Sequence, residues 1–286
     1  MADHTQQFPI SKMSQVFGVS RSGYYSWLGR GPSRRACQNK RLRAAIVRVW
    51  EGSKQMYGSP RIHRGLLGEG WQVSRQRIAR LMRKMGISSR IRKKWVATTD
   101  SNHRWPVAAN LLDRKFSPRG LSQVWVSDIT YIASEQGWLY LTTVMDLADR
   151  QILGWSLSRD MSASQTSVAA FRQAVTRRAP AAGMIFHSDQ GGQYACGEFT
   201  QMLNAHKITQ SMSRKGNCWD NAPAESFFKT LKYELDMPDR YESYQQARTA
   251  IFEFIEIWYN RKRLHSALNY QSPAQAEQKL KPKQAA

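Results

Sequence analysis

Hydrophobic residues recur with helical spacing near the start of the chain. Between residues 10 and 28 a short apolar-periodic segment ends at Gly18, and Ser20 is placed to cap a second helix. Two short helices around a glycine-containing turn are typical of a helix-turn-helix. We therefore predict an N-terminal helical module, helix-turn-helix-like, over residues 1–52.

The same pattern returns more clearly between residues 57 and 87. Ser74 is placed to cap a helix whose apolar positions follow the spacing i, i+3, i+4 and i+7. These positions are Ile78, Leu81, Met82 and Met85. The opposite face carries Arg75, Arg77 and Arg80, and an arginine-rich second helix is how such motifs enter a major groove. We predict a DNA-binding module over residues 53–96; a packing module with a solvated basic face is the alternative.

Beyond residue 120 the pattern changes from helical spacing to short β-rich runs. Residues 97–120 contain prolines and few periodic apolar positions, which predicts a linker. The predicted strands are residues 124–132, 138–145, 151–157, 184–187 and 208–212, and the predicted helices are 163–178, 198–206 and one bearing Glu225. This order predicts a mixed α/β layer fold over residues 121–236. Residues 237–286 are expected to form a C-terminal helix and a basic tail.

The charge of the chain is concentrated in its first part. The formal net charge is +22 over 286 residues. Residues 1–120 contain 25 Lys and Arg against 5 Asp and Glu, whereas residues 121–286 contain 18 against 16. Such a basic half favours binding to a polyanion. The sequence has neither a long apolar span nor a signal peptide, so we expect nucleic acid as partner, no membrane and a cytoplasmic location.

Two aspartates lie at positions of the predicted sheet where a ligand could bind. Asp128 lies inside a predicted strand and shares a face with Val126 and Thr130, because strand residues alternate between faces. A carboxylate among apolar neighbours loses hydration, which is unfavourable unless a cation compensates it. Asp189 directly follows a short strand and precedes a Gly-Gly turn. In open α/β sheets ligands gather at the carboxyl ends of the strands.

A third acid, Glu225, falls on a helix with two distinct faces. The apolar stripe consists of Phe227, Leu231 and Leu235. Glu225, Lys229 and Lys232 lie at i, i+4 and i+7 and form a separate face. One helix can therefore pack on a sheet while it presents an acid for metal and two lysines for phosphate.

The three acids together predict a Mg²⁺ site. Mg²⁺ prefers oxygen ligands, takes few carboxylates and completes its octahedron with water and phosphate oxygens. Two ions about 3.5–4 Å apart can activate an attacking oxygen and stabilise a leaving one. Singly, each acid has an ordinary explanation as a turn residue, a cap or a surface ion-pair partner. The three cysteines are widely separated and form no Cys-x-x-Cys pair, which argues against zinc or a disulfide framework.

Residues 110–273 closely resemble the integrase-core transposases of bacterial insertion sequences, specifically the second-reading-frame protein of insertion-sequence family three. The motifs that carry the resemblance are Trp-Val-Ser-Asp-Ile-Thr-Tyr at 125–131, His-Ser-Asp-Gln-Gly-Gly-Gln-Tyr at 187–194, Gly-Asn-Cys-Trp-Asp-Asn-Ala at 216–222, Glu-Ser-Phe-Phe-Lys-Thr-Leu-Lys at 225–232 and Tyr-Asn-Arg-Lys-Arg-Leu-His-Ser-Ala-Leu at 259–268. The module at 57–87 is similar to the helix-turn-helix that precedes this core in the family.

The resemblance implies a ribonuclease-H-like core with a catalytic and metal-binding triad of Asp128, Asp189 and Glu225, served by two Mg²⁺ or Mn²⁺ ions. It implies that Lys232 touches donor DNA and that Trp219 and Asn221 help to position DNA. Three nearby acids are expected to be structural: Asp146, Asp149 and Asp220.

The implied activity is cleavage of insertion-sequence ends and joining of the 3′-hydroxyl to target DNA. The implied partners are terminal repeats, target DNA and further copies of the chain, in a homodimer or larger synaptic assembly. An upstream-frame protein, joined by frameshift fusion, is also implied, as is a bacterial, nucleoid-associated location. A hydrolysis-only metal nuclease and a DNA-binding regulator with an inactive core are the alternatives. The two basic modules argue against the first, and the intact triad and Lys232 argue against the second.

Overall fold

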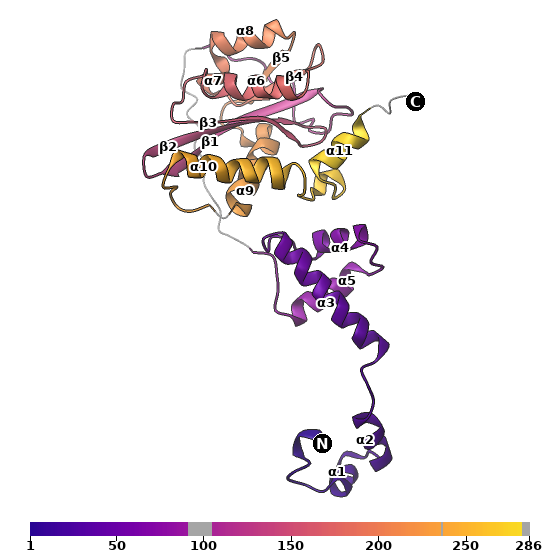
Figure 1. The fold of residues 1–286 in the computed structure, drawn as a ribbon. Coiled ribbons are helices and arrows are strands. Elements are labelled where there is room, and N and C mark those ends of the chain that lie inside the picture. The colour runs from indigo at the N-terminus through magenta and orange to yellow at the C-terminus, as the bar shows by residue number, and fades with distance from the viewer. Residues whose placement is uncertain (91–104, 236, 282–286) are drawn as a thin grey trace. The chain divides into compact units, whose positions relative to one another are not determined.

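The computed structural model describes residues 1–90, 105–235 and 237–281, and the chain divides into two compact units, Met1–Ser88 and Ser89–Ala286 (Figure 1). Residues 91–104 hold the end of the predicted second module and the start of the predicted linker, and they lie outside the described residues. The last five residues of the predicted basic tail also lie outside them.

The described part of the first unit is helical. After a 3₁₀ turn at Ala2–His4, its helices are α1 (Ile10–Phe17), α2 (Arg21–Leu28), α3 (Arg34–Gly52), α4 (Ser59–Gly68) and α5 (Arg75–Lys84). Gly18 ends α1 in the left-handed conformation, with φ 64°. Ser20 and Ser74 accept hydrogen bonds from backbone N–H groups in the first turns of α2 and α5. Both predicted caps are therefore confirmed.

Helices α3, α4 and α5 pack on one another around a small apolar core. Its fully buried side chains include Leu42 and Ile46 of α3, Ile62 and Leu66 of α4, and Ile78 of α5. The domain boundary that we predicted after residue 52 falls inside this packed group. The reason is that α3 presents an apolar stripe to the two helices that follow it.

The second unit is built on a five-stranded sheet. Its strands are β1 (Val124–Ser134), β2 (Gly137–Asp146), β3 (Ile152–Ser158), β4 (Ile185–Ser188) and β5 (Thr209–Met212). The order across the sheet is β3-β2-β1-β4-β5. The pairs β1–β2 and β2–β3 are antiparallel, whereas β1–β4 and β4–β5 are parallel. The predicted mixed α/β sheet is confirmed.

Helices cover both faces of the sheet (Figure 1). On one face lie α6 (Ser167–Arg177), α7 (Gly192–Ala195) and α8 (Gly197–Ala205). On the other face lie α9 (Ala222–Glu234), α10 (Tyr244–Phe252) and its π-helical continuation Glu253–Tyr259, with α11 (Pro273–Leu280) at the end. A side chain at Gly154 of β3 would collide with the backbone of Ala170 in α6, so this glycine allows the helix to lie close to the sheet.

Two segments that we predicted as peripheral belong to this core. Leu112 is buried, and the N–H groups of Leu111 and Leu112 donate to the Ser211 hydroxyl, so the described part of the predicted linker is bound to the second unit. The predicted C-terminal helix and tail likewise contributes buried side chains to the second face of the sheet, among them Ile251 and Phe254. Their apolar side chains complete the layer that α9 begins.

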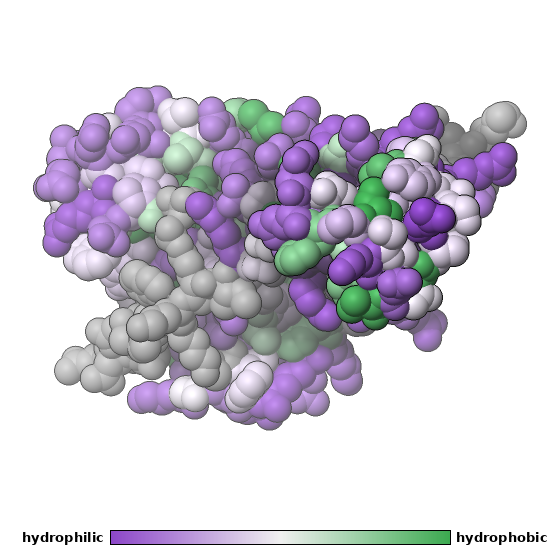
Figure 2. Space-filling view, turned by 90° about the horizontal axis from the view of Figure 1, so that it is seen from below, coloured by the Kyte–Doolittle hydropathy of each residue, from purple (hydrophilic) through white to green (hydrophobic). Residues whose placement is uncertain are grey.

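The face of the molecule seen in Figure 2 is mostly hydrophilic. In the face shown in Figure 2, hydrophobic residues form small, separate patches among hydrophilic ones. Within residues 1–90, 105–235 and 237–281, no helix is long and apolar enough to cross a membrane.

Candidate active site

The parallel pairing of β1 and β4 brings two of the predicted acids side by side. Val126 of β1 pairs with His187 of β4, and Asp128 and Asp189 each lie two residues further along. Continuing the register therefore makes them neighbours, because paired strands lie about 4.8 Å apart. Alternation places both on the face that α9 covers, since Val126 belongs to the same apolar cluster as the buried residues of α9.

The third acid reaches this place from α9. Phe227 and Leu231 are buried against the sheet, as the apolar stripe predicted, and Leu235 packs against the same cluster. Glu225 lies in the first turn of α9. Glu225 and Lys229 are exposed, whereas Lys232 is half-buried. The helix thus turns one face to the core and leaves the acid and the lysines at its edge.

The charges of this group act on one another. Burial raises the pKa of Asp128 well above its usual range, and the charge of Asp189 raises it further. The Ile129 N–H donates to Asp128 Oδ1 at 2.9 Å and lowers the pKa of Asp128. The charge of Glu225 raises that pKa, and the charge of Lys232 lowers it. Burial also raises the pKa of Glu225 and lowers that of Lys232. Ionising Asp128 is therefore unfavourable until more positive charge arrives.

The donor set fits a hydrated divalent cation better than a closed metal cage. Among the described residues, no three or more His, Cys, Asp or Glu side chains are grouped so that they could hold a metal ion by themselves. A structural zinc site needs such a group. Mg²⁺ does not, because it keeps several waters and uses one or two carboxylates. Asp128 and Asp189 could supply these carboxylates, and Glu225, whose charge raises the pKa of Asp128, is the third member of what we call the carboxylate cluster.

The turn after β4 shapes the surroundings of Asp189. The Gly191 N–H donates to Asp189 Oδ1 at 3.0 Å, and a side chain at Gly191 would press on that same oxygen. Glycine therefore lets the turn close on the carboxylate.

Tyr194 follows in α7, and its hydroxyl forms a hydrogen bond with Ser127 Oγ at 2.7 Å, next to Asp128. We did not predict this contact, because it joins residues 67 positions apart.

His187, which belongs to the same motif as Asp189, has a structural place. It is buried between two serines, with Nδ1 2.9 Å from Ser211 Oγ and Nε2 3.2 Å from Ser213 Oγ. Ser213 Oγ donates to the Ser188 carbonyl, so it accepts from a protonated Nε2. Burial lowers the pKa of His187 to about 4, which keeps the ring neutral at physiological pH. The ring thereby fixes β4 to β5 just before Asp189.

A buried aspartate organises the loop that leads into α9. Asp220 accepts two hydrogen bonds from the Arg214 guanidinium, both 2.8 Å long. It also accepts from Arg114 and Asn110, each at 2.9 Å. Hydrogen bonding to Arg214 is the main cause that holds the pKa of Asp220 well below its usual range. The structural role expected for Asp220 is confirmed.

The two loop residues expected to position DNA lie in opposite environments. Trp219 is 69% exposed, as a DNA contact requires. Asn221 is 4% exposed, and its Nδ2 donates to the Ser127 carbonyl at 3.1 Å. The side chain of Asn221 therefore points into the protein and joins the start of α9 to β1.

The other two acids predicted to be structural surround one arginine. Arg178 donates to Asp146 at 2.7 Å and to Asp149 at 2.6 Å, and it lies 3.0 Å from Glu277 of α11. Asp146 and Asp149 are fully buried. This cluster ties the end of α6 to the sheet and to the C-terminal helix, so the structural assignment of both aspartates is confirmed.

Comparison with known proteins agrees with this architecture. Residues 119–218 and 206–273 match the family models described as Integrase core domain, and residues 38–95 match the model described as HTH-like domain. The transposase InsF of insertion sequence IS3A from Escherichia coli K12 is 37% identical over 278 residues, which cover 96% of each chain. The chain belongs to the integrase-core transposases of IS3-type insertion sequences.

Further relatives extend the comparison. A 31 kDa protein of insertion element IS600 from Shigella sonnei, described as uncharacterized, is 42% identical over 267 residues, 93% of this chain and 98% of that protein. Among solved structures, the magnesium complex of the HTLV-2 integrase catalytic core is 14% identical, with a TM-score of 0.42, covering 55% of this chain and 96% of that one. A simian T-cell lymphotropic virus intasome is 12% identical, with a TM-score of 0.48, covering 84% and 78%.

In this transposase the arginines predicted to bind DNA are not equivalent. Arg75 and Arg80 are exposed on α5. Arg77 is half-buried, and its guanidinium donates twice to Asn39 Oδ1 of α3, at 2.9 and 3.2 Å. Arg77 therefore has a clear role in holding α5 against α3, which helical spacing within α5 did not reveal.

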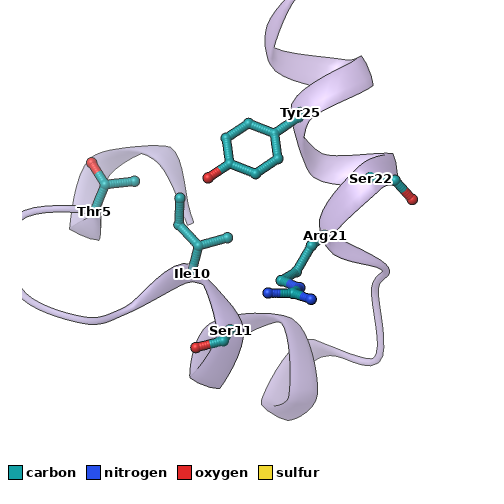
Figure 3. Close-up of a pocket in the computed structure, with 6 residues that line it drawn as sticks. All are labelled: Thr5, Ile10, Ser11, Arg21, Ser22 and Tyr25. Atoms are coloured by element: carbon teal, nitrogen blue, oxygen red, sulfur yellow. The ribbon is translucent and has the colours of Figure 1, made fainter.

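The transposase also has an open hollow of about 690 Å³ between α1 and α2. Ile10 and Tyr25 point toward one another across it (Figure 3). The residues that line it are Thr5, Ile10, Ser11, Arg21, Ser22 and Tyr25. They include a cation and no acid, so this hollow lacks the chemistry of the carboxylate cluster.

Proposed function

We propose that this transposase cleaves the ends of its insertion sequence and joins the 3′-hydroxyl to target DNA, with Asp128, Asp189 and Glu225 as catalytic acids. The observation that supports this most is the register of β1 and β4, which places Asp128 beside Asp189, while the charge of Glu225 from α9 also raises the pKa of Asp128. Perturbed acids gathered at the carboxyl end of parallel strands are typical of functional sites.

The three carboxylates would hold Mg²⁺ or Mn²⁺, two ions in the proposed arrangement. When bound, such ions make a hydroxyl oxygen a better nucleophile and stabilise a leaving oxygen. The protein's own part is to hold the carboxylates in place. Asp128 is fixed within a paired strand, Asp189 by the Gly191 N–H, and Glu225 by the packing of α9. Rigid supports of this kind keep reacting groups aligned.

DNA would approach along the basic edge of α9. Lys229 and Lys232 lie one and two turns after Glu225 and would neutralise phosphates next to the carboxylate cluster. Trp219, exposed just before α9, would stack on a base or sugar. In the first unit, Arg75 and Arg80 of α5 would contact DNA as a helix-turn-helix does.

We also propose assembly beyond the single chain. An insertion sequence has two ends, and the motifs that supply the three acids occur once per chain. A homodimer or larger synaptic complex would place one carboxylate cluster at each end. An upstream-frame fusion would add end recognition to this arrangement.

A strand-transfer assay tests the proposal. The full chain, and separately its upstream-frame fusion, is incubated in Mg²⁺ with a pre-cleaved oligonucleotide of the element's end. Joined product is expected from the wild type and is expected to disappear in Glu225→Gln. Glu198→Gln is the matched control, because Glu198 is also an exposed acid in the first turn of a helix, α8 on the opposite face. Product that persists in Glu225→Gln, or none from chain and fusion alike, would contradict the proposal.

A further inference from the structure

The side chain of Asn221 is satisfied at one end only. Its Nδ2 donates to the Ser127 carbonyl, and this bond fixes the orientation of the amide, because a carbonyl can only accept. The other end, Oδ1, is buried and is one of the few buried side-chain polar atoms without a hydrogen-bond partner in the described part of the chain. The residue is 4% exposed, so bulk water does not reach it freely.

Asn260 shows what a buried asparagine with a purely structural role looks like in the same unit. It is 3% exposed, its Oδ1 accepts from the Ile152 N–H at 3.0 Å, and its Nδ2 donates to the Ile152 carbonyl at 3.0 Å. Both ends are used, as is normal for buried polar groups. Asn221 is equally buried and leaves its acceptor open, so packing alone does not account for it.

The position of Asn221 connects it to two acids of the carboxylate cluster. Its hydrogen-bond partner, Ser127, immediately precedes Asp128. Along the chain it lies four residues before Glu225, which is one helical turn. Asn221 precedes α9 directly, yet its side chain does not cap the helix. The amide therefore joins the strand that carries one acid to the helix that carries another.

The chemistry of the open oxygen calls for a donor or a cation. The neighbouring acids are also acceptors when ionised, so they cannot satisfy Oδ1. The His, Cys, Asp and Glu side chains of the described residues do not form a complete metal cage. A neutral amide oxygen can extend an oxygen-rich cation site without adding a further negative charge.

We propose that Asn221 is a positioning residue of the divalent-metal site, whose Oδ1 accepts a hydrogen bond from a water bound to the cation at the carboxylate cluster. This inference rests on the proposed function of that cluster. Its Nδ2 holds β1 against the start of α9, and its Oδ1 orients the hydration shell. Groups that orient metal ligands in this way typically change affinity 10–100-fold when removed.

The test measures metal binding rather than catalysis. Mn²⁺ alone is titrated into the full chain, free Mn²⁺ is followed by electron paramagnetic resonance, and Mg²⁺ competition gives the second affinity. We expect Asn221→Ala to weaken Mn²⁺ binding about 10–100-fold. Asn260→Ala is the matched control, expected to lower the Tm of the metal-free protein without changing Mn²⁺ affinity. Asn221→Ser also removes Oδ1 but leaves a small polar side chain, so it is the second variant if the alanine variant does not fold.

Each outcome has a distinct meaning. Wild-type affinity in Asn221→Ala or Asn221→Ser, with only a lower Tm, would make the residue structural and overturn the inference while leaving the proposed function intact. Mn²⁺ binding that is absent from the wild type, or unchanged in Asp128→Asn, would instead overturn the metal site itself and the inference with it.

Discussion

Two groups of acids in the second unit are treated in opposite ways by the protein around them. Asp146, Asp149 and Asp220 are fully buried, and each accepts hydrogen bonds from an arginine. Around Asp128, by contrast, the charges that act on its pKa are two further acids and one lysine. In the first group the negative charges are balanced by arginines that hold the structure together. In the second group negative charge exceeds positive charge.

The difference is visible in the pKa directions. Arginine holds the pKa of Asp220 well below its usual range, whereas burial and a neighbouring acid raise that of Asp128 well above it. A fold gains nothing from gathering acids that repel one another, so such a group is a candidate for a ligand that brings positive charge. Charge balance around an acid therefore separates structural acids from the proposed catalytic ones.

The largest effect is expected from removing the arginine of the structural group. Arg178→Met leaves Asp146 and Asp149 buried without their cation. We expect the free energy of unfolding to fall by about 3–5 kcal/mol, because an uncompensated buried charge is strongly unfavourable. Urea unfolding of the full chain measures this. Arg172→Met, at an exposed site on α6, is the control. If both variants lose the same small amount of unfolding free energy, Arg178 does not compensate the buried aspartates, and the two groups of acids do not differ as we argue.

Asp149 tests the comparison further, because Arg178 donates to it and its pKa is nevertheless raised. Burial raises its pKa to about 6 despite the hydrogen bond from Arg178. Between about pH 4 and pH 6 the folded state then holds more protons than the unfolded state, so this group makes the protein less stable as pH rises. Asp149→Asn cannot titrate. Its stability relative to the wild type should therefore increase by about 3 kcal/mol over that window, since one pKa unit is worth about 1.4 kcal/mol.

Unfolding measured at several pH values checks this expectation. Asp160→Asn provides the control, because Asp160 is exposed and hydrogen bonding to Ser162 lowers its pKa instead. A constant difference between wild type and Asp149→Asn from pH 4 to pH 6 would show that Arg178 fully compensates the buried carboxylate.

Neutralising one acid from each group should change stability in opposite directions. Asp220→Asn weakens hydrogen bonds from two arginines, and we expect a loss of about 1.5–3 kcal/mol. Asp128→Asn removes a charge that the metal-free fold disfavours while an acceptor for the Ile129 N–H remains. We expect its Tm to rise. Thermal unfolding at pH 7 with a chelator measures both, and a lower Tm in each would contradict the comparison.

The sequence predicted the elements well because their signals are local. The β-rich runs of β1 and β2 and the helical stripe of α9 each depend on a few neighbouring residues. Ser20 and Ser74 cap helices within the first turn, as their positions predicted. The face of α9 that carries Glu225 could likewise be derived from spacing alone.

Contacts between distant segments could not be derived in the same way. Asp220 is held by Arg114, 106 positions away, and Asn221 donates to Ser127, 94 positions away. The sequence predicted a structural role for Asp220 but not its arginine partners, and it did not show that the Asn221 side chain joins β1 to α9. For the same reason, the C-terminal helix and basic tail were predicted without their packing on the sheet, because an apolar stripe does not say which surface it will cover.

The smallest expected effect extends the contrast from acids to arginines. Arg77 of α5 is held by Asn39, whereas Arg75 and Arg80 are exposed. Arg77→Ala should therefore lower the Tm of the full chain and change the salt dependence of DNA binding little. The double variant Arg75→Gln with Arg80→Gln should leave the Tm nearly unchanged and flatten the plot of log K against log salt by up to about 1.8, since each phosphate contact contributes about 0.9. Filter binding at several salt concentrations measures the slope for each variant. If Arg77→Ala alone flattens the slope, Arg77 leaves Asn39 to bind DNA. A hydrogen bond in the free protein would then not be enough to identify an arginine as structural.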